Sequence, residues 1–424
     1  MRHRGLPDLA LSGGHVTSPP EADAGTLRAS LPLVAAGFVI SFMLIGGGID
    51  TVGVFINAIT EANGWPRTGL SLGVAVGAAV AALSTPGVGI AVDRYGVRVP
   101  MLWGVGLLAT GFAIVVVMQA PWHFVVANVF LGMGFAGCAL LPLTIAITLR
   151  VRDRTALALG IAGTGASAGA LALAPATHAA IEALGWRGTY MVMGTLLVLT
   201  PLPCLAFALP RGRLERHTEA ERSKPALPSL RELGRPGLRG LIALMVLPGL
   251  ATFAIAVHLV PYLTDSGFSG ATAAFALGAT IGVSAVGKIA GGWLADRFGT
   301  LPIMRAALFL GALSLTLLPA AATSAYLAGF VALYGIALGT YAAVIPALAM
   351  ETLGGDRFGT LFGLLQLVAM LAAAAGPVTA GVLFDATGHY DEAMGIWIAA
   401  LSAALLVALV MRPRSSTARL GAEA

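Results

Sequence analysis

Charged residues are scarce in this chain of 424 residues, where Asp, Glu, Lys and Arg together make up only 11%. A soluble domain is about a quarter charged and roughly 45–50% apolar. Here the hydrophobic fraction is 57% and the mean hydropathy is +0.87. The charge is too sparse to coat a surface in water, so the composition excludes an ordinary soluble protein and indicates one embedded in lipid.

Cysteine is nearly absent too. Cys138 and Cys204 both lie within apolar runs, so they indicate neither a disulfide framework nor a redox compartment. No Cys and His grouping has the spacing of a metal site, and we find no nucleophile constellation of an enzyme. We therefore expect no enzyme activity, no metal and no cofactor.

Long apolar runs dominate what is present. A membrane-spanning helix needs about 20 mainly apolar residues, and backbone groups in lipid must be satisfied internally, which favours helices over strands. We therefore predict an all-α membrane protein with twelve transmembrane helices. The predicted runs are 31–59, 68–92, 99–119, 122–149, 156–181, 188–209, 238–263, 271–295, 303–321, 324–350, 358–384 and 391–410.

The segments outside these runs predict the domain organisation. Residues 1–30 are rich in Pro, Gly and Ser and are predicted to be a disordered tail, and the first run is too long for a signal-peptide core. The basic segment 210–238 separates a six-helix bundle at 31–209 from a second at 239–411, and 412–424 is a second tail. We interpret 210–238 as a solvated linker rather than a binder of nucleic acid or anionic lipid.

Basic residues fall in alternate loops. Cytoplasmic loops carry an excess of Lys and Arg, and the poorer set of loops here has only Arg67 and Arg187. An even number of spans puts both termini on one side. We expect both termini in the cytoplasm and the chain in the cell inner (plasma) membrane.

A turn signature occurs twice. The pattern G-x-x-x-D-R-aromatic-G occupies 89–96 after the second run and 292–299 after the eighth, and the two copies are offset by 203 residues. Asp153 and Asp356 share this offset, as do Gly160 and Gly363. These coincidences predict a duplicated unit, hence two six-helix bundles as parallel repeats.

The signature has a physical rationale. Gly permits a tight turn, and Asp and Arg can pair with each other or with neighbouring helix ends. Such contacts would hold the halves together on the cytoplasmic side in one state and break in another; alternatively, the Arg only anchors its loop inside. We favour a conformational gate. Its predicted members are Gly89, Asp93, Arg94, Gly96, Arg98, Gly292, Asp296, Arg297 and Gly299.

These residues resemble the major facilitator superfamily, whose cytoplasmic signature reads G-x-x-x-D-R-x-G-x-R. Residues 89–98 match it, and 292–299 match less fully. Segments 53–67, 157–187 and 257–261 resemble the monocarboxylate-transporter-like branch. That resemblance implies that Lys288 stands where a basic residue on the eighth helix binds the substrate carboxylate. Animal members have Lys where this chain has Asp50, and Asp where it has Ser284.

Ionisable residues inside spans usually face a cavity. Lys288 lies about 10 Å from the cytoplasmic end of its helix and could also snorkel. Asp50 has a short carboxylate that needs a partner, a proton or water. Their depths differ by about 16 Å, so we expect two poles of one cavity rather than a tight pair.

Further polar residues lie along the same path. The resemblance implies that the first and fourth helices of each repeat line the cavity. A relay of protons by His258 is chemically possible, although an interfacial His is equally compatible with its position. The predicted substrate-binding residues are Lys288, Asp50, Asn57, Asn128, His258, Tyr341 and Gln366.

Two glycine motifs imitate nucleotide-binding loops. The one at 282–288 lacks the Ser or Thr after Lys and follows no strand. The glycines at 163–169 are better explained by close helix packing. We reject both as nucleotide sites.

The favoured function is secondary transport of a small organic solute by alternating access, with a carboxylate-bearing metabolite as substrate and protons as candidate coupling ion. The alternative on the same fold is uptake or efflux of a larger polar or amphipathic metabolite or drug. A permease subunit of an ATP-driven complex is disfavoured by the duplicated turns. The expected partners are a small-molecule substrate and the lipid bilayer, with no nucleic acid, and the chain is expected to be a monomer.

Overall fold

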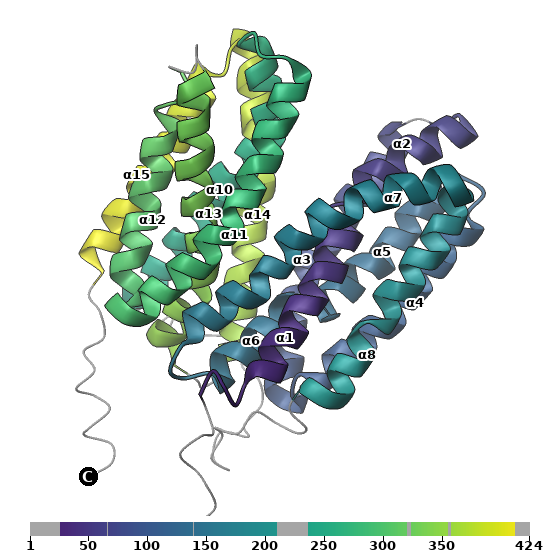
Figure 1. Ribbon diagram of the computed structural model, residues 1–424, viewed down its shortest axis with the longest axis horizontal. Helices are drawn as coiled ribbons and strands as arrows, with labels where there is room; N and C mark the ends of the chain where they lie inside the picture. The colour runs from purple at the N-terminus through teal and green to yellow at the C-terminus, as the bar shows by residue number, and fades with distance from the viewer. Residues whose placement is uncertain are drawn as a thin grey trace, which may run out of the picture.

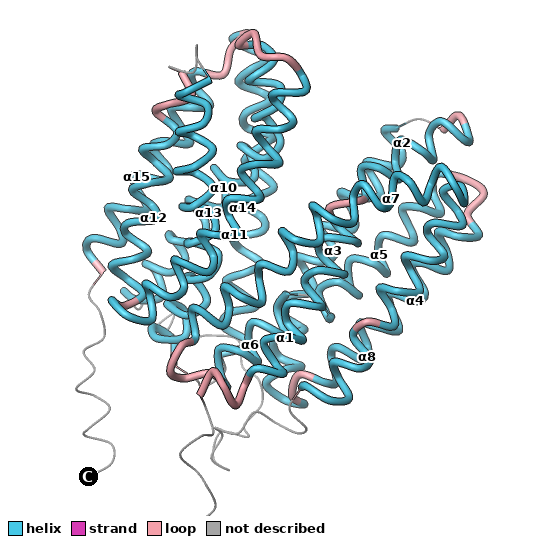
Figure 2. Tube along the Cα trace, in the orientation of Figure 1, coloured by secondary structure: helices cyan, strands magenta, loops and turns pink. Residues whose placement is uncertain are grey.

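The computed structural model describes residues 26–65, 67–138, 140–209, 236–319, 324–354 and 358–411. Within these ranges every regular element is a helix and no strand occurs (Figure 2). The all-α prediction is confirmed.

Twelve spans can be recognised in the described residues. Ten helical stretches are long and apolar enough to cross a membrane, and Thr300–Leu315 is a shorter apolar helix. One of the ten, Thr155–Ala208, contains two spans, because Gly185 has the non-helical angles φ 69° and ψ 167°. The twelve-helix prediction is therefore confirmed.

The first six spans form the N-terminal half. Its elements are α1 (Leu31–Ile40), η2 (Ser41–Ile49), α2 (Val52–Asn63), α3 (Arg67–Tyr95), α4 (Arg98–Val117), α5 (Pro121–Cys138), α6 (Leu140–Arg150), α7 (Thr155–Leu199), α8 (Pro201–Pro203) and η3 (Cys204–Ala208).

The other six spans form the C-terminal half. Its elements are α10 (Pro236–Asp265), α11 (Gly270–Phe298), α12 (Thr300–Leu315), α13 (Ser324–Leu353), α14 (Phe358–Thr387) and α15 (Asp391–Val410).

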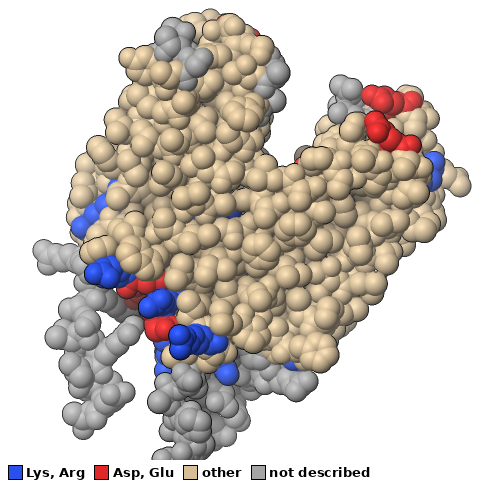
Figure 3. Space-filling view, viewed as in Figure 1, with Lys and Arg blue, Asp and Glu red and all other residues tan. Residues whose placement is uncertain are grey.

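The two halves lie side by side as a V (Figure 1). They meet at the end that holds the α3–α4 and α11–α12 turns, which we call the closed end. They diverge at the opposite end, where α2 lies, which we call the open end; the surface is hollowed between the halves there (Figure 3). The contacts between halves are those of α3 with α14 and of α7 with α11 and α13, with α6 adding smaller ones.

The outer surface is apolar. Large side chains such as Phe207, Phe275 and Trp103 are mostly exposed, and charged residues gather toward the closed end and at one tip of the open end (Figure 3). In water such a surface would aggregate. In a bilayer it faces lipid tails, so the fold is that of a multi-pass membrane protein.

The first span is not one regular helix. Its middle is the π-helix η2, and the hydroxyl of Thr51 donates to the carbonyl of Gly47 just beyond it. Gly46 packs directly on α7, since a Cβ placed on it would lie 2.5 Å from the backbone of Gly169. Gly165 and Gly169 thus serve close helix packing, whereas a Cβ on Gly163 would meet only Lys288 Cδ, at 3.7 Å.

Two boundaries differ from those predicted. The ninth run was predicted to extend to residue 321, but α12 ends at Leu315 and a turn follows; Pro319 disfavours helical geometry in the residue before it. Helix α10 begins at Pro236, inside the predicted linker. Asp356 and Arg357 lie outside the described residues.

Candidate functional site

A cavity of about 390 Å³ lies between the halves. Its wall is built by η2, α6 and α7 of the N-terminal half and by α10, α11, α13 and α14 of the C-terminal half. Neither half could form it alone. Its polar and charged lining residues within the described ranges are Ser41, Thr144, Thr252, Lys288, Tyr341 and Gln366.

Lys288 is the single charged residue among the described residues of this wall. Helix α11 crosses α7 so closely that a Cβ on Gly160 would lie 2.1 Å from the Lys288 carbonyl oxygen. The Lys288 ammonium donates to the Gly163 carbonyl at 3.1 Å and to the Ser167 hydroxyl at 2.9 Å. It therefore binds across to the other half and does not extend toward the membrane surface.

Ser167 extends this polar contact. It is buried, and its hydroxyl lies 3.5 Å from the hydroxyl of Ser284, one turn before Lys288 on α11. A neutral hydroxyl thus binds the ammonium and a second one lies behind it, and no carboxylate among the described residues forms an ion pair with it. Its positive charge is available to an anion that enters the cavity.

Asp50 lies apart from this wall. Its side chain is exposed, and it follows directly on the end of η2. It makes no ion pair with Lys288 in the described part of the chain, although the two charges are close enough to interact electrostatically.

Of the remaining predicted substrate-binding residues, two share the cavity with Lys288. Gln366 and Tyr341 line it from α14 and α13, and the Tyr341 hydroxyl donates to the Leu244 carbonyl at 2.9 Å. The side chain of Asn57 lies outside the described residues. Lys288, Tyr341 and Gln366 therefore line the same cavity, and their role in binding remains a prediction.

Asn128 and His258 lie away from the cavity wall. Asn128 is buried, donates to the Phe124 carbonyl at 2.8 Å and packs against Gly77 of α3. One ring nitrogen of His258 lies 3.1 Å from the Tyr390 hydroxyl and the other 3.0 Å from the Pro377 carbonyl oxygen. Both side chains are therefore engaged in contacts within one half.

The predicted gate residues lie at the closed end. Asp93, near the end of α3, accepts hydrogen bonds from the backbone N–H groups of Gly359 (3.0 Å) and Thr360 (2.7 Å) and from the Thr360 hydroxyl (2.6 Å). These donors form the first turn of α14 in the other half. The N-terminus of a helix has unpaired N–H groups and a partial positive charge, so a carboxylate stabilises it.

The second copy repeats this contact with the halves exchanged. Asp296, near the end of α11, accepts hydrogen bonds from the backbone N–H groups of Ala156 (3.0 Å) and Leu157 (2.8 Å), in the first turn of α7. Two carboxylates thus join the halves in reciprocal fashion.

The glycines of the signature have two separate tasks. Gly96 and Gly299 have φ of 79° and 95° and turn the chain between adjacent spans. Gly89 and Gly292 instead allow the halves to touch: a Cβ on them would lie 2.1 Å from the Gly359 oxygen and 2.4 Å from the Ala156 oxygen, respectively.

The signature arginines lie around these contacts. Arg98 donates to the Leu209 carbonyl at 2.8 Å and so ties α4 to the end of the sixth span. Arg94 lies over the ring of Tyr95, and Arg297 over the rings of Trp293 and Phe298.

Sequence reasoning did not single out Thr85 or Ser167. The Thr85 hydroxyl donates to the Gly363 carbonyl at 3.1 Å, again between the halves. The 203-residue offset could have found Thr85, because it is the counterpart of Lys288 in the first repeat. Nothing in the sequence pointed to Ser167, whose importance comes from the crossing of α7 and α11.

Two six-helix halves that share a central cavity and meet at one end are the architecture expected of a membrane transporter rather than of an enzyme. The family model of the Major Facilitator Superfamily matches residues 38–377 and 281–423, and the chain belongs to that superfamily.

Curated relatives place it near one branch. It is 28% identical over 228 residues to monocarboxylate transporter 11 of Mus musculus (51% of each chain) and 30% identical over 322 residues to monocarboxylate transporter 3 of Rattus norvegicus (71% of this chain, 63% of the relative). It is 27% identical over 253 residues to the MFS-type transporter YcxA of Bacillus subtilis (56% and 59%). The matched region spans about half the length of the first of these relatives. The resemblance to the monocarboxylate-transporter-like branch is confirmed.

Solved structures share the fold. The fucose:proton symporter FucP of E. coli superposes with a TM-score of 0.71 at 17% identity, over 91% of this chain and 98% of that one. A bacterial homologue of the iron transporter ferroportin in its outward-facing state gives a TM-score of 0.71 at 16% identity, over 90% and 99%.

Proposed function

We propose that this protein is a secondary active transporter that carries a carboxylate-bearing organic solute across the membrane by alternating access. The observation that carries the proposal is Lys288, the lone cation in the described wall of the cavity between the halves. Its similarity to monocarboxylate transporters 11 and 3 supports the same substrate class. One chain supplies both walls, so a monomer is sufficient.

Lys288 binds the substrate carboxylate in this proposal. A half-buried ammonium is costly unless it is compensated, and here only a carbonyl and a hydroxyl compensate it. An entering carboxylate would supply a full opposite charge. It would also compete with the contacts to Gly163 and Ser167 that join the two halves, so binding and rearrangement of the halves become linked.

We further propose that protons are the coupling ion and that Asp50 carries the proton. A carboxylate at the C-terminal end of a helix is disfavoured by the partial negative charge there, and Asp50 follows the end of η2. A proton would remove that cost. One proton with one carboxylate then makes the transport step electrically neutral.

We propose that the closed end faces the cytoplasm of a cell whose inner membrane holds the protein. The basic residues described at this end, including Arg94, Arg150 and Arg297 at the ends of α3, α6 and α11, fit the excess of Lys and Arg in cytoplasmic loops. The structure then represents the outward-open state. The helical boundaries support bundles at 31–209 and about 239–411, as the sequence predicted.

The proposal is tested with purified protein in proteoliposomes, an inward proton gradient and radiolabelled butyrate. We expect saturable uptake that Lys288→Gln abolishes and Lys288→Arg partly retains, because Arg keeps the charge. Asp50→Asn should leave counterflow of butyrate intact and remove acceleration by the gradient. Normal uptake by correctly folded Lys288→Gln protein would overturn the assignment of Lys288.

A further inference from the structure

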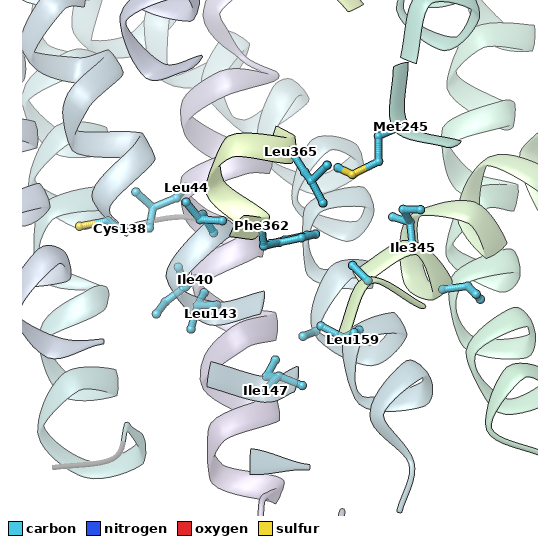
Figure 4. Packing of buried hydrophobic residues seen from close by; sticks show 14 of the residues in the cluster. Ile40, Leu44, Cys138, Leu143, Ile147, Leu159, Met245, Ile345, Phe362 and Leu365 are labelled. Carbon is cyan, nitrogen blue, oxygen red and sulfur yellow. The ribbon is translucent and has the colours of Figure 1, made fainter. Parts of the chain in front are cut away.

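The wall of the central cavity is mostly hydrocarbon. Of its 22 described lining residues, 14 are Ala, Ile, Leu, Met, Phe or Pro, two are Gly, five are uncharged polar and one is Lys288. The lining residues Leu159, Met245, Ile345 and Phe362 are buried and come from four helices, α7, α10, α13 and α14 (Figure 4). Such a wall favours an apolar body in the bound solute.

The charges of the wall admit one negative group. Lys288 can pair with one carboxylate, and a second carboxylate would be left unpaired against hydrocarbon, at a high cost. No Asp or Glu occurs among the described lining residues, so the ammonium of an amino acid would also lack a partner in the wall. Dicarboxylates and zwitterions are therefore disfavoured.

The polar groups of the wall are partly in use. The Tyr341 hydroxyl donates to the Leu244 carbonyl, and the Thr252 hydroxyl donates to the Pro248 carbonyl at 2.7 Å. Of the five uncharged polar side chains described in the wall, Ser41, Thr144 and Gln366 are left, too few for a solute rich in hydroxyls. A polyol or a hydroxy acid would regain only part of the hydrogen bonds that it loses to water.

The volume is large for a two- or three-carbon acid. At about 390 Å³, the cavity falls at the lower end of the range of roughly 300–1,000 Å³ typical of pockets for small organic ligands. We propose that this site takes a monocarboxylate with a hydrocarbon body, branched, aromatic or a chain of several carbons, in preference to hydroxy acids, dicarboxylates and amino acids. This inference rests on the proposed function and narrows its substrate class.

A homologous series tests the inference. Binding of straight-chain acids from acetate to octanoate to the purified protein is measured by calorimetry, with Lys288→Gln protein as the background for partitioning into detergent. Each methylene that enters an apolar wall should strengthen binding by about fourfold. We expect this rise to continue to at least five carbons and then level off as the cavity fills.

Matched six-carbon acids test the charge and hydroxyl arguments separately. Hexanoate should bind about fivefold or more tightly than 6-hydroxyhexanoate, and about tenfold or more tightly than adipate and 6-aminohexanoate. Phe253→Ala removes a half-exposed ring (52%) from the wall and should reduce the gain in binding strength per added methylene. Phe309→Ala, an equally exposed ring (54%) outside the lining, should leave the series unchanged.

The outcomes separate the two levels of the proposal. Lys288-dependent binding of lactate or adipate that equals or exceeds binding of hexanoate overturns the apolar-body inference but leaves carboxylate transport standing. Folded, monodisperse protein that binds no carboxylate of the panel overturns both. If binding strengthens with chain length equally steeply in Phe253→Ala protein, the cavity wall is not the cause of that increase.

Discussion

The α3–α14 and α7–α11 crossings are two copies of one contact, related by the 203-residue repeat, yet they differ at their centres. At the closed end they are alike, because Asp93 and Asp296 each bind the first turn of the helix that they cross. Halfway along, Thr85 donates to the Gly363 carbonyl in one copy, and Lys288 donates to the Gly163 carbonyl in the other.

This difference separates the contacts that hold the two halves together from the residue that would select the solute. The duplicated contacts at the closed end depend on backbone geometry and on helix ends, which any solute would need equally. The charge of Lys288, which would distinguish one solute from another, occurs only in the α7–α11 crossing. The symmetric part suits a rearrangement of two halves, and the asymmetric part suits recognition of one anion.

The largest effect is expected where the two crossings are most alike. Gly89→Ala and Gly292→Ala each place a methyl group against backbone of the other half. Overpacking costs about 1–3 kcal/mol, so the closed state should lose about 5- to 150-fold in population. Spin labels at Tyr95 and Phe298, after replacement of Cys138 and Cys204, would report a longer distance across the closed end.

Two other glycines control for the substitution itself. Gly87 lies on α3 and Gly282 on α11, and a Cβ on either meets nothing within 4 Å. Gly87→Ala and Gly282→Ala should leave the label distance and the transport rate within about twofold, since Ala favours a helix over Gly. Equal losses in all four variants would show that the closed end does not depend on this close approach.

A smaller effect is expected from the carboxylates. Asp93→Asn and Asp296→Asn keep the side-chain shape but remove the charge that stabilises a helix N-terminus, worth about 0.3–2 kcal/mol. We expect the maximal transport rate to change by about 2- to 30-fold with KM altered much less. The change should be larger for Asp93, which accepts a third hydrogen bond from the Thr360 hydroxyl. A dominant loss of affinity would indicate a direct ligand role instead.

The arginines beside these carboxylates should matter less again. Arg94→Ala and Arg297→Ala remove contacts with neighbouring aromatic rings worth about 0.5–1 kcal/mol at exposed sites. We expect transport to slow by about two- to fivefold with little change in substrate affinity. Measured rates in proteoliposomes that are unchanged for both variants would leave these arginines as loop anchors only.

The fold could be predicted from the sequence because spans in lipid are set by length and composition, which are local properties. Most of the twelve runs match the observed helices within a few residues. The exceptions are informative: the first span is interrupted by η2, where Gly46 packs against Gly169, and α12 ends early at a turn. Neither follows from hydropathy.

The site was predictable in part. Lys288 stood out because a charge inside a span is costly, and Asp93 and Asp296 stood out because they recur. The partners of these residues did not, because Gly163, Ser167 and the first turns of α7 and α14 bind through backbone and hydroxyl groups that leave no mark in a sequence. Asn128 and His258 were ranked by helix position, yet which face of a helix meets the cavity is decided by packing.

The last comparison concerns Thr85, the counterpart of Lys288. Thr85→Val keeps the shape of the side chain and removes one hydrogen bond between the halves, worth about 0.5–1.5 kcal/mol. Because Thr85 carries no charge and is absent from the described cavity lining, KM for butyrate should stay within about twofold while the maximal rate changes by less than about tenfold. The exchange variant that combines Thr85→Lys with Lys288→Thr should not recover carboxylate uptake, since the ammonium would then start from α3, which supplies no described residue of the cavity lining. Recovery of uptake by that variant, measured at equal protein abundance, would show that the two crossings are equivalent and that the site is not confined to one repeat.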